Sequence, residues 1–334
     1  MEIDLPLIWA AIIAFGIFMY VVMDGFDLGI GILFPFIRDQ AERDLMMNSV
    51  APIWDGNETW LVLGGAGLFA AFPLAYSVVL TALYLPLTLM LIALIFRGVA
   101  FEFRFKAKRT RYLWDAAFIG GSVVATFTQG LVLGAFIDGL PVANRAYAGG
   151  PFDWLAPFPL FTGAALLVGY AMLGCGWLIL KTEGRLQRQM FQLMLPLACT
   201  LLLSIAIVSL WTPLAHAAIA RRWFSLPNLL FFFPVPLLVA LTLLALVRAV
   251  LRRREVQPFV LTLVLIALSY LGLAISLWPN IVPPALSIWE AAAPAKSQAF
   301  TLVGVLVMLP IILIYTAHNY YVFRGKIRLG EGYH

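Results

Sequence analysis

Residues 7–34 read LIWAAIIAFGIFMYVVMDGFDLGIGILF, an apolar stretch that contains only two charged side chains. A helix of about 20 apolar residues spans the hydrocarbon core of a bilayer, so this stretch predicts a transmembrane helix. The two charged side chains, Asp24 and Asp27, are three residues apart and therefore share one face of that helix. An aspartate at membrane depth costs roughly 2.5–3.5 kcal/mol on insertion scales, so this pair requires a reason.

The composition extends the same interpretation to the whole chain. Of 334 residues, 63% are hydrophobic and 12% are charged, and the mean hydropathy is +0.95. A soluble domain has roughly 45–50% apolar and about 25% charged residues. The sequence shows no alternating pattern of the kind that forms a membrane barrel, so we expect an all-α polytopic membrane protein. The net charge of +5 resides in loops, and no motif supports a nucleic-acid partner.

Nine apolar stretches are candidate membrane spans, separated by turn-forming residues such as those in WPNIVPP. The fifth span loosely repeats the glycine spacing of the first. We therefore expect one integral-membrane domain, 1–334, built from two four-helix bundles, 1–140 and 141–280, and a peripheral last helix with a tail, 281–334. The spans are expected at 7–34, 53–73, 76–100, 115–137, 158–180, 192–212, 229–250, 257–278 and 300–323.

The distribution of Lys and Arg predicts the orientation in the membrane. Alternate loops and the C-terminal segment hold 17 of the 22 basic residues, whereas the loops on the other side hold four. Because loops rich in Lys and Arg stay in the cytoplasm, we expect a periplasmic N-terminus and a cytoplasmic C-terminus. The remaining basic residue, Arg97, lies at the inner end of the third span.

Polar side chains gather on the cytoplasmic halves of the first three expected spans. Asp24 and Asp27 lie in the first, Asp55 and Glu58 open the second, and Arg97 lies in the third. Arg97 is the natural partner for one of the aspartates, although a buried ion pair adds little net stability. Intramembrane carboxyl groups build proton relays, so these residues are candidates for a proton path. The alternatives are an ordinary helix start at Asp55 and charge pairs that only hold the bundle together.

Close helix packing is expected next to the two aspartates. Gly25 and Gly29 are four residues apart, which allows a neighbouring helix to approach the backbone. The three histidines, by contrast, are scattered, and the two cysteines have no metal-binding spacing. We therefore expect no metal ligands in this chain, and we expect Arg104 to lie at the membrane interface.

Four motifs resemble one known family. They are MDGFDLGIG at 23–31, SVAPIWDGNETW at 49–60, LFAAFPLAY at 68–76 and FRGVAFEFR at 96–104. Together they resemble subunit II of the bacterial cytochrome bd-type quinol oxidases, including the cyanide-insensitive branch. The resemblance is sharpest over 20–115, and it covers the whole chain in length and span count.

This resemblance implies a function, a partner and cofactors. Subunit II of the family pairs with a haem-bearing subunit I, which holds haem b, haem d and the quinol site and reduces O2 to water. Subunit II itself binds no haem, supports assembly and lines a hydrophilic path from the cytoplasm of the bacterial inner membrane. The resemblance also allows a structural quinone or lipid in this chain and small single-span subunits in the complex.

The same resemblance carries over residue by residue. The two acids and the arginine of the family correspond to Asp27, Asp55 and Arg97, and the acid that follows W-D-G-N is Glu58. Asp55 would lie at the mouth of the path, and Arg97 would fix the ionised form of Asp27. Two other classes of protein remain open at this stage, namely a proton-coupled secondary transporter and a purely structural membrane scaffold.

Overall fold

The computed structural model describes residues 4–328, most of which are helical. The elements follow in this order: α1 (Leu5–Leu33), η1 (Phe34–Phe36), α2 (Gln40–Asn48), α3 (Trp54–Ala71), α4 (Pro73–Phe103), α5 (Arg111–Asp138), β1 (Val142–Ala143), β2 (Ala146–Tyr147), α6 (Pro157–Lys181), α7 (Gly184–Ala215), α8 (Ala217–Phe224), α9 (Asn228–Phe232), α10 (Pro234–Leu251), α11 (Gln257–Leu277), β3 (Asn280–Val282), β4 (Leu286–Ser287) and α12 (Ala295–Val322).

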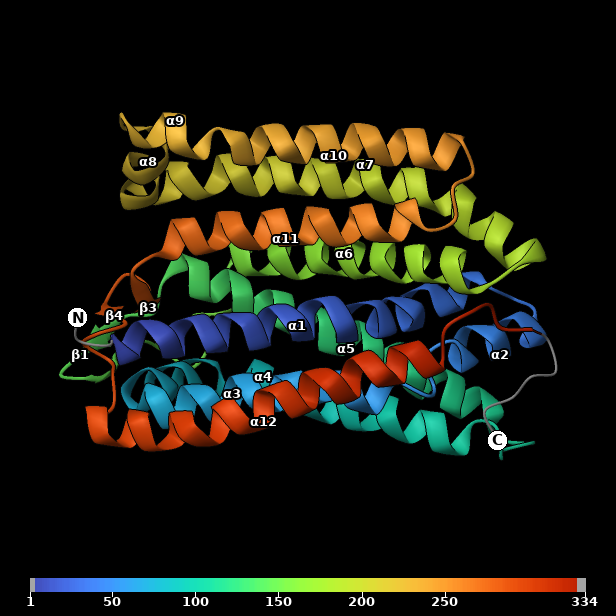
Figure 1. Cartoon of the computed structure of the whole chain (residues 1–334), viewed down its shortest axis with the longest axis horizontal. Coiled ribbons are helices and arrows are strands. Elements are labelled where there is room, and N and C mark those ends of the chain that lie inside the picture. Colours follow the sequence, from blue (N-terminus) through green and yellow to red (C-terminus); the bar gives the residue numbers. More distant parts are fainter. Residues whose placement is uncertain (1–3, 329–334) are drawn as a thin grey trace.

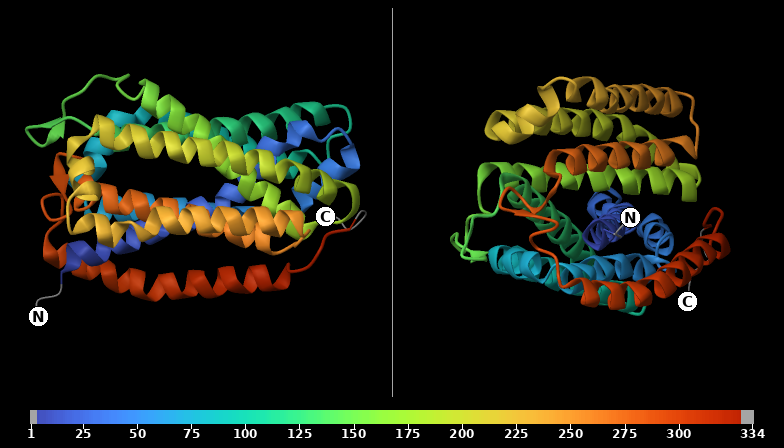
Figure 2. Two further views of the ribbon diagram at one scale, coloured as in Figure 1. Left: turned by 90° about the horizontal axis from the view of Figure 1, so that it is seen from above. Right: turned by 60° about the vertical axis from the view of Figure 1, so that its left-hand side comes forward.

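The long helices run side by side along the longest axis of the molecule (Figure 1). Helices α7 and α10 form one outer layer, and α6 and α11 lie beneath them. Helix α1 runs through the middle, where it packs against α3, α5 and α6. Helix α12 lies on the opposite outer side, next to α1 and α3 (Figures 1 and 2). The first and last described residues therefore lie at opposite ends of the bundle.

Eight helical segments of the described chain are long and apolar enough to cross a membrane. They are α1 with η1, α4, α5, α6, α7, α9 with α10, α11 and α12. The prediction of an all-α polytopic membrane protein is thus confirmed. The remaining expected span, 53–73, corresponds to α3, whose first two turns contain Asp55, Asn57 and Glu58 and are too polar to qualify by composition. The division into two four-helix bundles and a peripheral helix stays a prediction.

Glycines bring α1 and α6 into backbone contact. A Cβ atom added to Gly29 would lie 1.9 Å from the carbonyl oxygen of Tyr170, and one added to Gly174 would lie 2.6 Å from the carbonyl carbon of Gly29. No side chain fits between the two helices at this crossing. Gly25 meets the ring of Tyr170 in the same way. The prediction that Gly25 and Gly29 admit a neighbouring helix is confirmed, and the neighbour is α6.

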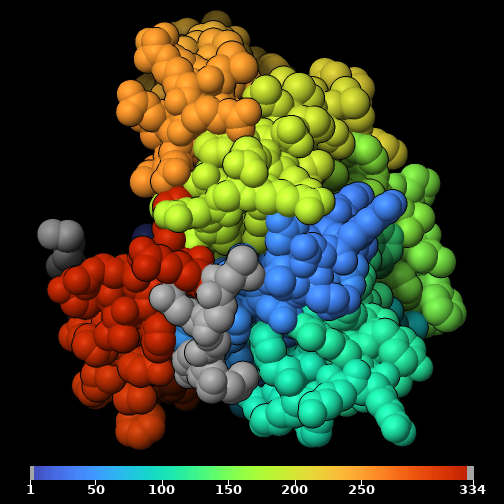
Figure 3. All heavy atoms as spheres, turned by 90° about the vertical axis from the view of Figure 1, so that its right-hand side faces the viewer, coloured from blue at the N-terminus to red at the C-terminus, as the bar shows by residue number. Residues whose placement is uncertain are grey.

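Short elements close the two ends of the bundle. The hairpins β1–β2 and β3–β4 lie at the end where α1 begins. At the other end, the surface of α2 lies between the segment that follows α4 and the start of α7 (Figure 3). Two backbone carbonyls of the turn that follows α6 hold the segment after α12: Ile327 N–H donates to Lys181, and Lys326 Nζ donates to Thr182. Hydrogen bonds from Lys326 and from Gln187 lower the pKa of Glu255 in the α10–α11 loop.

Candidate functional site

Three charged side chains from three helices meet inside the bundle. Arg97 of α4 and Asp24 of α1 have no solvent-exposed surface, and their Nη1 and Oδ1 atoms are 2.7 Å apart. Arg97 Nη2 also donates to Oε1 of Glu58 on α3, whose side chain is 26% exposed. We refer to Asp24, Glu58 and Arg97 as the central ion triad. The triad joins the buried interior to a group that reaches the surface.

The packing around Arg97 explains where its side chain points. A Cβ atom on Gly121 of α5 would lie 2.6 Å from the carbonyl oxygen of Ala93 and 2.9 Å from the Arg97 nitrogen, so α5 and α4 touch through their backbones here. On another side, the ring of Trp54 lies against Gly98 and stacks on Phe101 with a centroid distance of 5.0 Å. The guanidinium therefore extends toward α1 and α3, where the acids lie.

Asp27 belongs to a second set of contacts, which we call the Asp27 branch and which consists of Asp27, Asn57 and Tyr320. Asn57 Nδ2 donates to Asp27 Oδ2 at 2.7 Å, and the Tyr320 hydroxyl of α12 donates to Asn57 Oδ1 at 2.9 Å. Asp27 has no exposed surface, and Asn57 is 1% exposed. The expectation that Arg97 pairs with Asp27 is wrong, because the ion-pair partner of Arg97 on α1 is Asp24, one turn earlier.

A third set of contacts leads from Asp24 toward α6. Tyr20 lies one helical turn before Asp24 and interacts with its carboxyl. Gln129 of α5 donates from Nε2 to the Tyr20 hydroxyl at 2.7 Å, and the Tyr170 hydroxyl of α6 donates to Gln129 Oε1 at 3.0 Å. We call Tyr20, Gln129 and Tyr170 the Gln129 bridge. None of the three was predicted from the sequence, because an isolated Tyr or Gln in an apolar run forms no recognisable pattern.

The charges of the site do not balance. Asp24, Asp27 and Glu58 supply three carboxyl groups, and Arg97 supplies the one cation in direct contact with them among residues 4–328. An uncompensated charge inside a low-dielectric bundle is expensive, so the three carboxyls cannot all be ionised at low cost. We therefore expect at least one of the three carboxyl groups to be protonated, and their titrations to be coupled.

Asp55 lies at the rim of this site. It is exposed in the first turn of α3, three residues before Glu58 and on the same face of the helix. Asp55 is thus exposed, Glu58 is partly exposed, and Asp24 and Asp27 are fully buried. The four acids singled out from the sequence therefore differ in burial from the surface to the interior, although Asp55 forms no ion pair with Arg97.

A separate group of charges lies at the same end of the molecule as α2. We call it the Arg104 cluster. Arg104 has no exposed surface, although the sequence predicted an interfacial position. Its Nη1 donates to Asp44 Oδ1 at 2.6 Å, and its Nε donates to Asp115. Arg104 directly follows the last residue of α4, seven residues after Arg97 and on the same side of the helix, and this spacing was the overlooked signal. The cluster consists of Arg43, Asp44, Arg104, Arg111 and Asp115.

The histidines of residues 4–328 lie far apart, on α12 and at the end of α7. No group of three His, Cys, Asp or Glu side chains within residues 4–328 has the geometry to hold a metal ion. His216 follows α7 and contacts Asp138 Oδ1 through Nε2 at 3.2 Å, whereas His318 is exposed near the other end of the bundle on α12. Two histidines so placed cannot serve as axial ligands of one haem.

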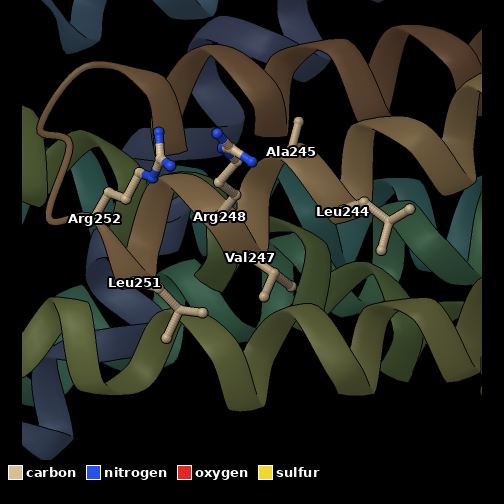
Figure 4. A pocket seen from close by; sticks show the side chains of 6 residues that line it. All are labelled: Leu244, Ala245, Val247, Arg248, Leu251 and Arg252. Atoms are coloured by element: carbon tan, nitrogen blue, oxygen red, sulfur yellow. The ribbon is translucent and has the colours of Figure 1, made fainter.

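A surface groove runs along α10, apart from these polar groups (Figure 4). Leu244, Val247 and Leu251 line it together with Arg248 and Arg252, which extend from the end of the helix. A row of apolar side chains with arginines at its end suits a lipid, because the apolar side chains contact the tails and the arginines contact the headgroup. None of the acids described above lines this groove.

Comparisons with known proteins agree in naming one family. The sequence profile described as "Cytochrome bd terminal oxidase subunit II" matches residues 5–323. "Cytochrome bd-I ubiquinol oxidase subunit 2" of Escherichia coli (strain K12) is 30% identical over 362 aligned positions, which cover 97% of this chain and 95% of that protein. "Cytochrome bd ubiquinol oxidase subunit 2" of Bacillus subtilis (strain 168) is 29% identical over 339 positions, covering 97% and 96%.

The fold is also similar to that of a solved structure. A chain of the bd oxidase from Geobacillus thermodenitrificans superimposes with a TM-score of 0.75 over 96% of this chain and 100% of that chain. The two sequences are 17% identical, so this likeness concerns the fold alone.

Proposed function

Because this chain belongs to the cytochrome bd terminal oxidase subunit II family, we propose that its buried carboxyl groups carry protons from the cytoplasm toward the haem site of the partner subunit. The chain is the second subunit of a quinol oxidase that reduces O2 with electrons from quinol in the inner membrane of bacteria. Each O2 takes up four protons to form two waters, and those protons must cross protein to reach a buried haem.

The excess of carboxyl groups over cations in the buried site carries this proposal. Three acids share one arginine, and the series runs from exposed Asp55 through partly exposed Glu58 to buried Asp24 and Asp27. In this proposal Glu58 receives a proton from the aqueous side, and Arg97 then stabilises the ionised carboxylate of Asp24. In this scheme Asp24 and Asp27 exchange protons with groups deeper in the complex.

The orientation follows from the basic residues. We propose that α3 crosses the membrane as the ninth span, with its polar turns shielded by α1 and α4. The N-terminus is then periplasmic and the C-terminus cytoplasmic, in agreement with the position of the described ends on opposite sides of the bundle. The acids open toward the cytoplasmic side, from which an inner-membrane oxidase would draw its protons.

The haems belong to the partner in this proposal. Haem b and haem d would reside in subunit I, since the histidines of the described chain do not converge. Replacing His216 and His318 together should leave every haem band in the visible spectrum of the purified complex intact. Loss of any one band would show that this chain supplies a ligand.

The proton path is tested by two neutral substitutions. Asp55→Asn and Glu58→Gln keep the size and the hydrogen-bonding capacity but remove the titrating group. We expect the haem content per complex to persist while O2 consumption per haem falls by about tenfold or more. Glu102→Gln is the matched control, because Glu102 is an exposed acid at the end of α4 that contacts only Lys106 among the described charges.

One result would contradict the proposal outright. If Asp55→Asn, Glu58→Gln and Asp27→Asn all retain the wild-type turnover per haem, the acids are structural and the protons take another route. The family assignment would stand in that case, since it depends on the sequence and not on the path.

A further inference from the structure

The last helix reaches the buried acids through one side chain. Helix α12 lies on the outside of the bundle, and Gln298 is its one buried residue in the described chain. Nevertheless, the Tyr320 hydroxyl donates to Asn57 Oδ1 at 2.9 Å, and Asn319 Nδ2 donates to the carbonyl oxygen of Pro52 at 3.3 Å. Two neighbouring residues of α12 thus hold the segment at which α3 begins.

These contacts fix the direction of the Asn57 side-chain amide. Its Nδ2 group donates to Asp27 Oδ2 at 2.7 Å and faces the Met23 carbonyl oxygen at 3.4 Å, and both of these acceptors belong to α1. Its Oδ1 atom faces the Tyr320 hydroxyl, which can donate to it. A reversed amide would present oxygen to two oxygens of α1, so Tyr320 and α1 together select one orientation.

That orientation favours one form of Asp27. An N–H group that donates to Oδ2 stabilises the carboxylate more than the carboxylic acid. The other oxygen, Asp27 Oδ1, is buried and accepts no hydrogen bond from the side chains and backbone that the structure describes. Asp27 is therefore held by one oxygen and open to a proton at the other.

We propose that Tyr320 is a positioning residue for proton transfer: through Asn57 it holds Asp27 with Oδ2 occupied and Oδ1 ready to accept and release a proton. This inference rests on the proton path proposed above. It adds to that path a positioning residue on α12, a helix that otherwise contributes little to the site. Tyr320 acts through Asn57 and does not itself carry the proton. Its hydroxyl donates to Asn57 and not to Asp27.

Burial and neighbouring charged groups also act on Asp27, and they set the background for the test. Asp24 lies one turn away on α1, Arg97 approaches from α4 and Glu58 from α3. Tyr320→Phe retains all three of these groups, so a shift in the titration of Asp27 after that change reports the loss of the Tyr320 hydroxyl.

The test uses the assembled oxidase carrying Tyr320→Phe, which removes the hydroxyl and keeps the ring. Asn57 then loses one of the groups that orient it, and its hydrogen bond to the Asp27 carboxylate weakens. The pH midpoint at which the infrared band of Asp27 titrates should therefore rise, by up to about one unit. The pH profile of turnover per haem should move in the same direction.

Two further variants keep the outcome interpretable. Tyr315→Phe on the same helix is the matched control, because Tyr315 is exposed, and it should leave both midpoints unchanged. Incorporation of 3-fluorotyrosine at position 320 keeps the shape and strengthens the donor, so both midpoints should fall. If Tyr320→Phe lowers the haem content, the fluorotyrosine protein still decides the question, because a structural role gives no shift of opposite sign.

Failure of this inference differs from failure of the proton path. If Asp27→Asn abolishes turnover but neither change at position 320 moves the infrared midpoint, Tyr320 is structural and the path stands. If the infrared midpoint moves as expected while Asp27→Asn keeps full turnover, Tyr320 positions Asp27 but Asp27 does not belong to the path. If neither the infrared midpoint nor turnover responds to any of these changes, both ideas are overturned.

Discussion

Replacing Asp24 by asparagine should destabilise the protein more than the same change at Asp27. Asp24 and Arg97 are both fully buried, and their nearest atoms are 2.7 Å apart. Asp24→Asn removes the anion and leaves a buried guanidinium with Glu58 as its remaining ion-pair partner. Breaking a buried pair by removing one partner costs roughly 3–5 kcal/mol, and because the Glu58 contact is retained we expect a loss of about 3 kcal/mol.

Asp27→Asn is the matched comparison. Asp27 has no cation within ion-pair distance in the described chain, and its contact with Asn57 can persist because an amide oxygen also accepts a hydrogen bond. The expected loss of stability is about 1 kcal/mol, the size of one ordinary hydrogen bond. The sequence alone suggested the opposite order, since it paired Arg97 with Asp27.

The measurement is the midpoint of thermal unfolding of the purified complex, with haem per complex as the second readout. The double variant Asp24→Asn with Arg97→Gln removes both charges, so it should recover part of the stability lost in Asp24→Asn. Glu58, which is partly exposed, can then be solvated. Equal losses for Asp24→Asn and Asp27→Asn, or a double variant less stable than Asp24→Asn alone, would refute this reasoning.

Three further predictions follow from the packing, the Arg104 cluster and the orientation. Gly29→Ala places a Cβ 1.9 Å from a carbonyl oxygen of α6 and should sharply lower the yield of assembled complex. Gly65→Ala is the control, because a Cβ there has nothing within 4 Å, and equal yields for the two variants would contradict the packing. Arg104→Gln removes the buried cation that Asp44 and Asp115 share, although Arg111 and Arg43 still pair with them, and should cost about 1.5–3 kcal/mol in thermal unfolding; an unchanged midpoint would indicate a solvated cluster. A reporter fused after Tyr112 should read cytoplasmic and one within 142–155 periplasmic, and the reverse at either position would overturn the orientation.

The membrane helices could be predicted closely because hydrophobic length fixes them. The first expected span, 7–34, corresponds to Leu5–Leu33, and the eighth, 257–278, corresponds to Gln257–Leu277. The sixth span begins eight residues earlier than its expected start at 192, at Gly184, because a helix continues into water through polar residues such as Arg185 and Arg188. A hydropathy pattern ends at the membrane surface, but the hydrogen-bonded helix does not.

The sequence singled out the charged residues of the site, but it did not show which acid pairs with Arg97. Burial of charge in an apolar run singled out Asp24, Asp27 and Arg97, since such residues are costly and therefore rare. The choice of partner depends on how α4 is rotated and how deep it lies against α1. Those quantities depend on the backbone contact at Gly121, which leaves no trace in the spacing of the acids. The contribution of Tyr320 was out of reach for the same reason, because the position of α12 depends on tertiary packing.

The link between Asn57 and Tyr320 also has a consequence for biogenesis. The two residues are 263 positions apart in the chain, so α1 and α3 enter the membrane long before α12 is translated. Until then, the amide that holds Asp27 lacks the hydroxyl that orients it. Completion of the acid site is therefore one of the last steps of synthesis. A nascent chain interrupted before α12 would carry its buried acids in the bilayer without the Tyr320–Asn57 hydrogen bond. A finished subunit and such a fragment therefore differ in the hydrogen bonding of the acid site.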